Sequence, residues 1–107
     1  MPTIQEIMQA AKNAGASDVH ITVGIPPKMR VNGNLITMDY PKMMPQDTLS
    51  VAYSIMNDVQ RERFDERGEY DMSFSIPELG RYRVNVYKQR GSAALALRLV
   101  GTQVPAP

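Results

Sequence analysis

The sequence predicts an α+β fold, in which one antiparallel β-sheet of about five to six strands carries helices packed on one face. Three observations indicate this fold: an N-terminal segment with helical periodicity, later segments in which apolar and polar residues alternate, and short glycine-containing turns between those segments. Short turns join antiparallel neighbours, whereas parallel strands need long crossovers. The expected order of elements is α-β-β-β-α-α-β-β-β, which is that of an α+β fold.

The first helix is predicted to begin at a capping box. Thr3 can accept a hydrogen bond from the Glu6 amide while the Glu6 side chain bonds back to Thr3. Gly15 stands where a left-handed C-cap would end the helix. Apolar residues with helical spacing lie between these signals, at Ile4, Ile7, Met8 and Ala11.

Short strands and then two short helices are expected next. Residues 18–23 alternate, with Val19, Ile21 and Val23 on one side, and Asn32-Gly33 is typical of a type I′ hairpin between strands 29–31 and 35–38. Helical spacing then recurs at Leu49, Ala52, Tyr53 and Met56. Asn57 or Asp58 can cap a further helix over 59–67, with Val59 and Phe64 as apolar anchors and its charged residues in solvent.

Three strands are predicted to complete the chain. Residues 70–76, 81–88 and 93–100 alternate, and the turns between them are short. In an antiparallel sheet covered on one side, apolar side chains point inward and polar ones outward. The inward set is Tyr82, Val84, Val86, Leu95, Leu97 and Leu99. The outward set is Arg81, Arg83, Asn85, Ala94, Ala96 and Arg98.

The charge of the chain is unevenly distributed. The formal net charge is +1, but residues 1–78 hold all eleven acidic residues against seven Lys or Arg, for a net charge of −4. Residues 79–107 hold no acid, and their five cations give +5. Such a segment indicates an anionic partner, although the acidic part of the same fold could also neutralise it. The cations are Arg81, Arg83, Lys88, Arg90 and Arg98.

Several kinds of chemistry are absent from the sequence. There is no cysteine, no phosphate-binding loop and a single histidine, His20, so a protein metal site and a catalytic triad are not expected. Asp18 is predicted to cap the turn after Gly15, and Asp71 has no visible carboxylate partner for acid–base work. The chain alone is therefore predicted not to be an enzyme. No signal peptide and no apolar run of membrane-spanning length are visible, which fits a cytoplasmic protein.

Three motifs together resemble the N-terminal domain of the PilT family, the type IV pilus retraction ATPases (twitching motility proteins) of the secretion ATPase superfamily. They are G-A-S-D-V-H-I at 15–21, G-I-P-P with R-V-N-G at 24–33, and R-Y-R-V-N-V with Q-R-G-S at 81–92. The resemblance runs from the first helix to Val100. It implies a PAS-like domain over 1–100, followed by the start of an interdomain linker at 101–107 and a RecA-like ATPase domain.

The resemblance also implies cofactors, partners and site residues. ATP with Mg²⁺ would be bound in the full-length protein, which would form a homo-hexamer at the cytoplasmic face of the inner membrane. The partners of this domain would be the RecA-like domains of the same and neighbouring subunits, and the motor would also contact an inner-membrane pilus platform protein. Arginines of the N-terminal domain would close over the nucleotide phosphates. Arg83 is the first candidate, with Arg81 on the same face, Arg90 in the turn, and Arg98 as a weaker candidate. A guanidinium suits this role because it binds phosphate bidentately.

Other interpretations stay open from the sequence. Arg83 could pair with a carboxylate of a neighbouring subunit and serve only assembly. A stand-alone PAS-like module for ligand sensing or protein interaction would need a cavity lined by residues such as Met29, Met72 and Phe74, although these are better interpreted as core. A nucleic-acid-binding sheet would expose several stacking aromatics, and Tyr87 is the one outward aromatic on the basic strand, so no nucleic-acid partner is expected.

Overall fold

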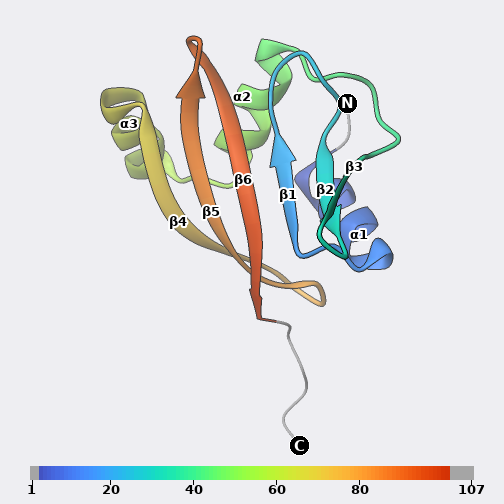
Figure 1. Ribbon diagram of the computed structural model, residues 1–107. Coiled ribbons are helices and arrows are strands. Elements are labelled where there is room, and N and C mark those ends of the chain that lie inside the picture. The colour runs from blue at the N-terminus through green and yellow to red at the C-terminus, as the bar shows by residue number, and fades with distance from the viewer. Residues whose placement is uncertain (1–2, 102–107) are drawn as a thin grey trace, which may run out of the picture.

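The computed structural model describes residues 3–101 and confirms the α+β class (Figure 1). The helices are α1 (Ile4–Ala14), α2 (Pro45–Ser54) and α3 (Asp58–Arg67). The strands are β1 (Asp18–Ile21), β2 (Lys28–Val31), β3 (Asn34–Thr37), β4 (Glu69–Ile76), β5 (Gly80–Gln89) and β6 (Ser92–Gly101). In the described residues they form one six-stranded antiparallel sheet in the order β3-β2-β1-β6-β5-β4. The expected linker, 101–107, lies outside the described residues except for Gly101, which ends β6.

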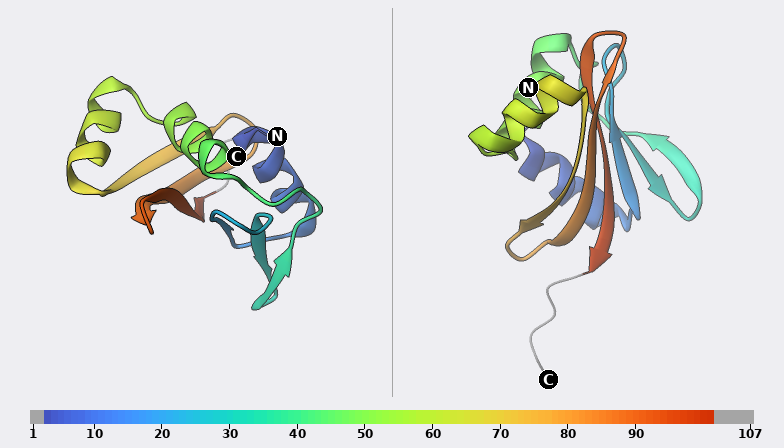
Figure 2. Two further views of the ribbon diagram at one scale, coloured as in Figure 1. Left: turned by 90° about the horizontal axis from the view of Figure 1, so that it is seen from above. Right: turned by 90° about the vertical axis from the view of Figure 1, so that its left-hand side faces the viewer.

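The sheet has two different faces. The three helices lie on one side of it, and the β2–β3 hairpin bends away from them toward the other side (Figure 2). The pairing of β1 with β6 joins the N-terminal strands to the C-terminal strands, because Val19 lies opposite Leu97 and Ile21 opposite Leu95. We call the side without helices the open face.

Helix α1 forms as its sequence signals predict. The Thr3 hydroxyl accepts from the Glu6 amide at 3.1 Å, and the Thr3 amide donates to Glu6 Oε1 at 3.3 Å. Gly15 ends the helix with φ +76°, a left-handed conformation that glycine adopts without a steric penalty. The predicted apolar stripe is the buried one, formed by Ile4, Ile7, Met8 and Ala11.

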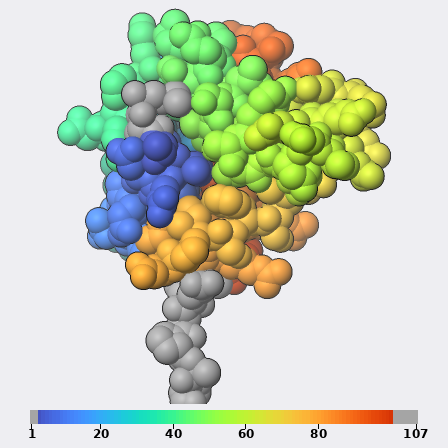
Figure 3. All heavy atoms as spheres, turned by 180° about the vertical axis from the view of Figure 1, so that it is seen from behind, coloured from blue at the N-terminus to red at the C-terminus, as the bar shows by residue number. Residues whose placement is uncertain are grey.

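The core lies between the helices and the sheet. Its fully buried side chains include Phe64 of α3 and Ile7 of α1, which meet apolar residues from the central strands. On β5, buried and exposed residues alternate as predicted, with Tyr82, Val84 and Val86 inside. The helices do not cover this side completely: seen from behind, the β4–β5 region lies uncovered beside α1 and α3 (Figure 3), and Met72 and Phe74 remain half-buried.

One predicted strand end and two predicted apolar contacts are wrong. Val23 is not part of β1, which ends at Ile21; Val23 instead forms an isolated bridge to Met43. Leu49 is 40% exposed and Val59 is 57% exposed. The stripe that α2 and its C-cap bury is Thr48, Val51, Ala52 and Ile55, a complete i, i+3, i+4, i+7 set, and a helix that buries this set must turn Leu49 toward solvent.

The charged surface of α3 also differs from the prediction. Asn57 caps the helix by accepting from the Gln60 amide at 2.8 Å, as expected. Arg61, however, does not extend freely into solvent. Its guanidinium donates to the Tyr53 carbonyl at 2.8 and 3.1 Å and lies 5.4 Å from the Tyr53 ring centroid. The Tyr53 hydroxyl in turn donates to Asp65 at 2.8 Å. We call this group, Tyr53, Arg61 and Asp65, the α2–α3 corner.

Candidate functional site

A row of polar side chains crosses the open face from strand to strand. Cross-strand register places Arg30 of β2 opposite Asp18 of β1, Asp18 opposite Arg98 of β6, and Arg98 opposite Arg83 of β5. Arg83 and Arg98 are exposed, and so is Arg81 two residues before Arg83. The prediction that these arginines point away from the core is therefore confirmed.

Arg83 and Arg98 form an unneutralised pair. As directly opposite residues on neighbouring antiparallel strands, their Cβ atoms lie about 5 Å apart, and like charges in this arrangement destabilise a sheet. Within residues 3–101, neither guanidinium has a carboxylate within ion-pair distance, and the same holds for Arg81 and Arg90. We call Arg83 and Arg98 the arginine pair.

Asp18 lies directly opposite Arg98, but other groups already bind its carboxylate. Ser17 Oγ donates to Asp18 Oδ1 at 2.8 Å, His20 Nε2 lies 2.7 Å from Asp18 Oδ2, and Arg30 Nε lies 3.4 Å from Oδ1. Burial opposes ionisation of Asp18, but the hydrogen bonds from Ser17 and His20 and the nearby positive charge outweigh it and lower its pKa. The predicted role of Asp18 as a cap for the turn after Gly15 is not what the structure shows.

The acids of β4 are held in a similar way. Asn85 Nδ2 donates to Asp71 Oδ1 at 2.7 Å and to Glu69 Oε1 at 3.2 Å. Asn85 lies on β5 two residues from Arg83 and directly opposite Asp71. Asp71 borders the same hollow as Arg83, but its Oδ1 accepts from Asn85 and forms no ion pair with either arginine. The sequence offered no signal for this contact, because it depends on the register of β4 against β5.

Two hollows surround the arginine pair. The first, of about 430 Å³, extends over the open face between Arg30 and Asp71, and Arg83 and Arg98 border it beside the small side chain of Ala96. The second, of about 610 Å³, lies toward the β4 edge, where Arg81 joins Arg83. Both are broad and shallow, so a group docking from outside could reach the guanidinium groups.

Arg90 is separate from the other candidate arginines. It occupies the β5–β6 turn with φ +54°, followed by Gly91 with φ +81°, a type I′ arrangement. Seven steps along the chain separate it from Arg83, or about 23 Å at the rise of a β-strand. The two arginines therefore cannot meet on one phosphate group.

Ala94, near this turn, is buried although it was expected to lie on the open face with its side chain exposed. It is 1% exposed, and the larger Tyr87 lies opposite it on the same face.

His20 has a structural partner but, among the described residues, no nucleophile beside it. Its ring nitrogen Nε2 contacts Asp18. Ser17, the residue before Asp18 in the chain, bonds to the same carboxylate and not to His20. In the part of the chain that the structure describes, no group of three His, Cys, Asp or Glu side chains is arranged to hold a metal ion. Likewise, none of the described helices is long and apolar enough to cross a membrane.

Comparison with known proteins identifies the class of this domain. The chain is 36% identical over 101 residues to the type IV pilus retraction ATPase PilT of Pseudomonas aeruginosa, covering 94% of the chain and 29% of that protein. A crystal structure of the pilus retraction motor PilT with bound ADP superposes with a TM-score of 0.89 at 42% identity, covering 98% of the chain and 31% of that structure. The Legionella pneumophila ATPase DotB shares the fold, with a TM-score of 0.78 at 22% identity over 95% of the chain and 29% of DotB. No protein-family profile matches the chain.

The fold and sequence are those of the N-terminal domain of a secretion-type ATPase. Within that class the chain belongs with the PilT-type pilus ATPases, as the three sequence motifs indicated. The chain spans about three tenths of the length of the relatives it matches.

Proposed function

We propose that this chain is the N-terminal domain of a pilus retraction ATPase and that its open face contacts the phosphates of ATP held by a RecA-like domain of the same or a neighbouring subunit. The observation that carries the proposal is the arginine pair, two adjacent guanidinium groups without an acidic partner among the described residues. An anion placed between Arg83 and Arg98 would relieve their repulsion and accept hydrogen bonds from both.

The chain supplies only part of such a site. It has no phosphate-binding loop, so ATP and its Mg²⁺ would be held by the other domain, and this chain would add positive charge at the phosphates. Phosphoryl transfer spreads negative charge over the equatorial phosphate oxygens, and an arginine placed there accelerates other ATPases by about 10³-fold or more. Arg81 is close enough to assist the pair. Arg90 would serve a different contact, at the far end of the β5–β6 hairpin.

The wider setting follows from the same proposal. The domain would sit in a homo-hexamer at the cytoplasmic face of the inner membrane, where the motor meets a pilus platform protein. The similarity of the chain to PilT, a pilus retraction ATPase, supports placing the domain in such a motor. The second candidate is a ligand-sensing or protein-interaction module without ATPase coupling. It does not explain why two arginines without an ion pair among the described residues lie side by side on the open face.

The test uses the longer protein that contains this domain together with its ATPase domain. Arg83→Ala should lower ATP turnover by about 10²- to 10³-fold while the melting temperature changes little, because an exposed arginine that forms no ion pair within residues 3–101 stabilises little structure. Arg63→Ala is the matched control, since Arg63 is an exposed arginine on α3. Unchanged turnover, or a loss of stability that parallels the loss of turnover, would contradict the proposal.

A further inference from the structure

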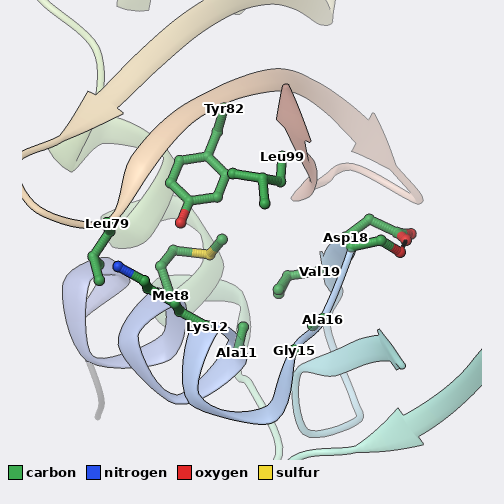
Figure 4. Close-up of a pocket in the computed structure, with 11 residues that line it drawn as sticks. Met8, Ala11, Lys12, Gly15, Ala16, Asp18, Val19, Leu79, Tyr82 and Leu99 are labelled. Atoms are coloured by element: carbon green, nitrogen blue, oxygen red, sulfur yellow. Dashed lines mark hydrogen bonds between the residues drawn. The ribbon is translucent and has the colours of Figure 1, made fainter. Parts of the chain in front are cut away.

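A cavity of about 150 Å³ lies at one end of the sheet, between α1 and strands β1, β5 and β6 (Figure 4). Its wall is mostly apolar and includes Met8, Val19, Leu79 and Leu99. Small residues create the space: Ala11 faces it from α1, and Gly15 and Ala16 form the loop that closes one side.

One aromatic hydroxyl enters this cavity. Tyr82 is only 4% exposed, and Figure 4 shows its ring entering the space from β5 with the hydroxyl directed toward α1. No fully buried side-chain oxygen or nitrogen among the described residues lacks a hydrogen-bond partner, so the Tyr82 hydroxyl, for which no such bond is found there, is reached by solvent through the cavity. Burial raises the pKa of Tyr82, so the hydroxyl keeps its proton at neutral pH.

The other polar side chains at the cavity already have partners. Lys12 is exposed at the rim, and its Nζ donates to the carbonyl oxygen of Glu78 at 2.7 Å. Ser17 and Asp18 also line the cavity, and Ser17 Oγ donates to Asp18 Oδ1 at 2.8 Å. An enclosed apolar cavity of this size binds molecules such as benzene in other proteins, whereas this cavity is open at its rim and carries the Tyr82 hydroxyl.

We propose that this cavity is a binding site for a small aromatic molecule bearing one oxygen, of the size of phenol. The ring would fill the space beside Ala11 and Val19, and the oxygen would exchange a hydrogen bond with the Tyr82 hydroxyl. This site is separate from the arginine pair: Arg83 points to the open face, whereas Tyr82, its neighbour in sequence, points to the helix-covered face.

The test is a titration of the 107-residue chain with phenol and with benzene, followed by amide chemical shifts in two-dimensional NMR spectra. Phenol should produce saturable shifts concentrated at Met8, Ala11, Val19 and Leu99. Tyr82→Phe keeps the ring but removes the hydroxyl, so it should weaken phenol about fivefold and leave the affinity for benzene unchanged, as expected for one neutral hydrogen bond. Ala11→Leu fills the cavity and should abolish binding of both probes.

Ala16→Val fills the cavity from the loop and replaces Ala11→Leu if the latter does not fold. The absence of saturable shifts with phenol would overturn the proposal. So would phenol binding that survives a folded cavity-filling variant, since the molecule would then be bound elsewhere. Equal weakening of phenol and benzene by Tyr82→Phe would overturn the assigned hydrogen bond.

Discussion

The α2–α3 corner and the arginine pair place the same kind of side chain in opposite circumstances. Arg61 at the corner donates two hydrogen bonds to the Tyr53 carbonyl and lies over the Tyr53 ring. Arg83 and Arg98 lie beside each other on the open face without such contacts among the described residues. The two acids that border the same hollow, Asp18 and Asp71, are bonded to other groups.

This difference separates an arginine that stabilises the fold from arginines that are available to a partner. At the corner, guanidinium hydrogen bonds connect two helices and satisfy a carbonyl near the end of α2. On the open face, neighbouring like charges cost stability, and no ion pair to Arg83 or Arg98 is formed within the described part of the chain. The comparison therefore predicts that removing an arginine has opposite consequences in the two regions.

The largest effect is expected at the corner. Arg61→Ala should lower the free energy of unfolding by about 2 kcal/mol, because it removes two charged hydrogen bonds and the contact with the Tyr53 ring. Urea unfolding followed by circular dichroism measures this change. Arg63→Ala on the same helix should change stability by less than about 0.5 kcal/mol. Equal effects of the two substitutions would remove the distinction between the corner and ordinary surface charge.

An intermediate effect is expected at Asp18, which holds Arg30 and His20. Asp18→Asn should cost up to about 1 kcal/mol at neutral pH, since it turns an ion-paired arginine into an unpaired one. The folded-state pKa of Asp18 is lowered from its ordinary 3.8, so the stability from its charge is present above about pH 4. That contribution is lost as the pH falls through the lower folded-state value. Urea unfolding at neutral pH and below pH 4 should show the difference between variant and parent chain shrinking; a difference that grows in acid would contradict this account.

The smallest effect is expected at the arginine pair itself. Arg83→Ala and Arg98→Ala should each change the free energy of unfolding by less than about 0.5 kcal/mol, with any change toward greater stability, because each substitution removes a repulsive neighbour. Added salt screens this repulsion, so it should stabilise the parent chain more than the double variant. Urea unfolding at low and high salt measures both quantities. A clear loss of stability in both single variants would show that these arginines support the fold.

Part of this arrangement could be predicted from local pattern alone. The alternation in β5 decided which side chains face the core, and it placed Arg81 and Arg83 outside without any knowledge of topology. The partner of Arg83 could also have been found by counting. The two-residue turn at Arg90 and Gly91 sets Gln89 opposite Ser92, and the same count pairs Arg83 with Arg98.

The remaining features depend on contacts between distant segments. Asp18 meets Arg98 only because β1 pairs with β6, and no turn connects these strands. For α2, both the predicted stripe, which begins at Leu49, and the observed stripe, which begins at Thr48, have helical spacing. Packing on the sheet buries the second stripe and leaves Leu49 exposed. Arg61 resembled its charged neighbours in sequence, and its role appears only where α2 ends against α3.

The position of β6 has a mechanical consequence. This strand is hydrogen-bonded on both sides, to β5 and to β1, and the chain leaves the sheet from its end at Gly101. A pull on Gly101 along the strand would load both ladders in shear, so that many hydrogen bonds would resist together instead of unzipping one after another.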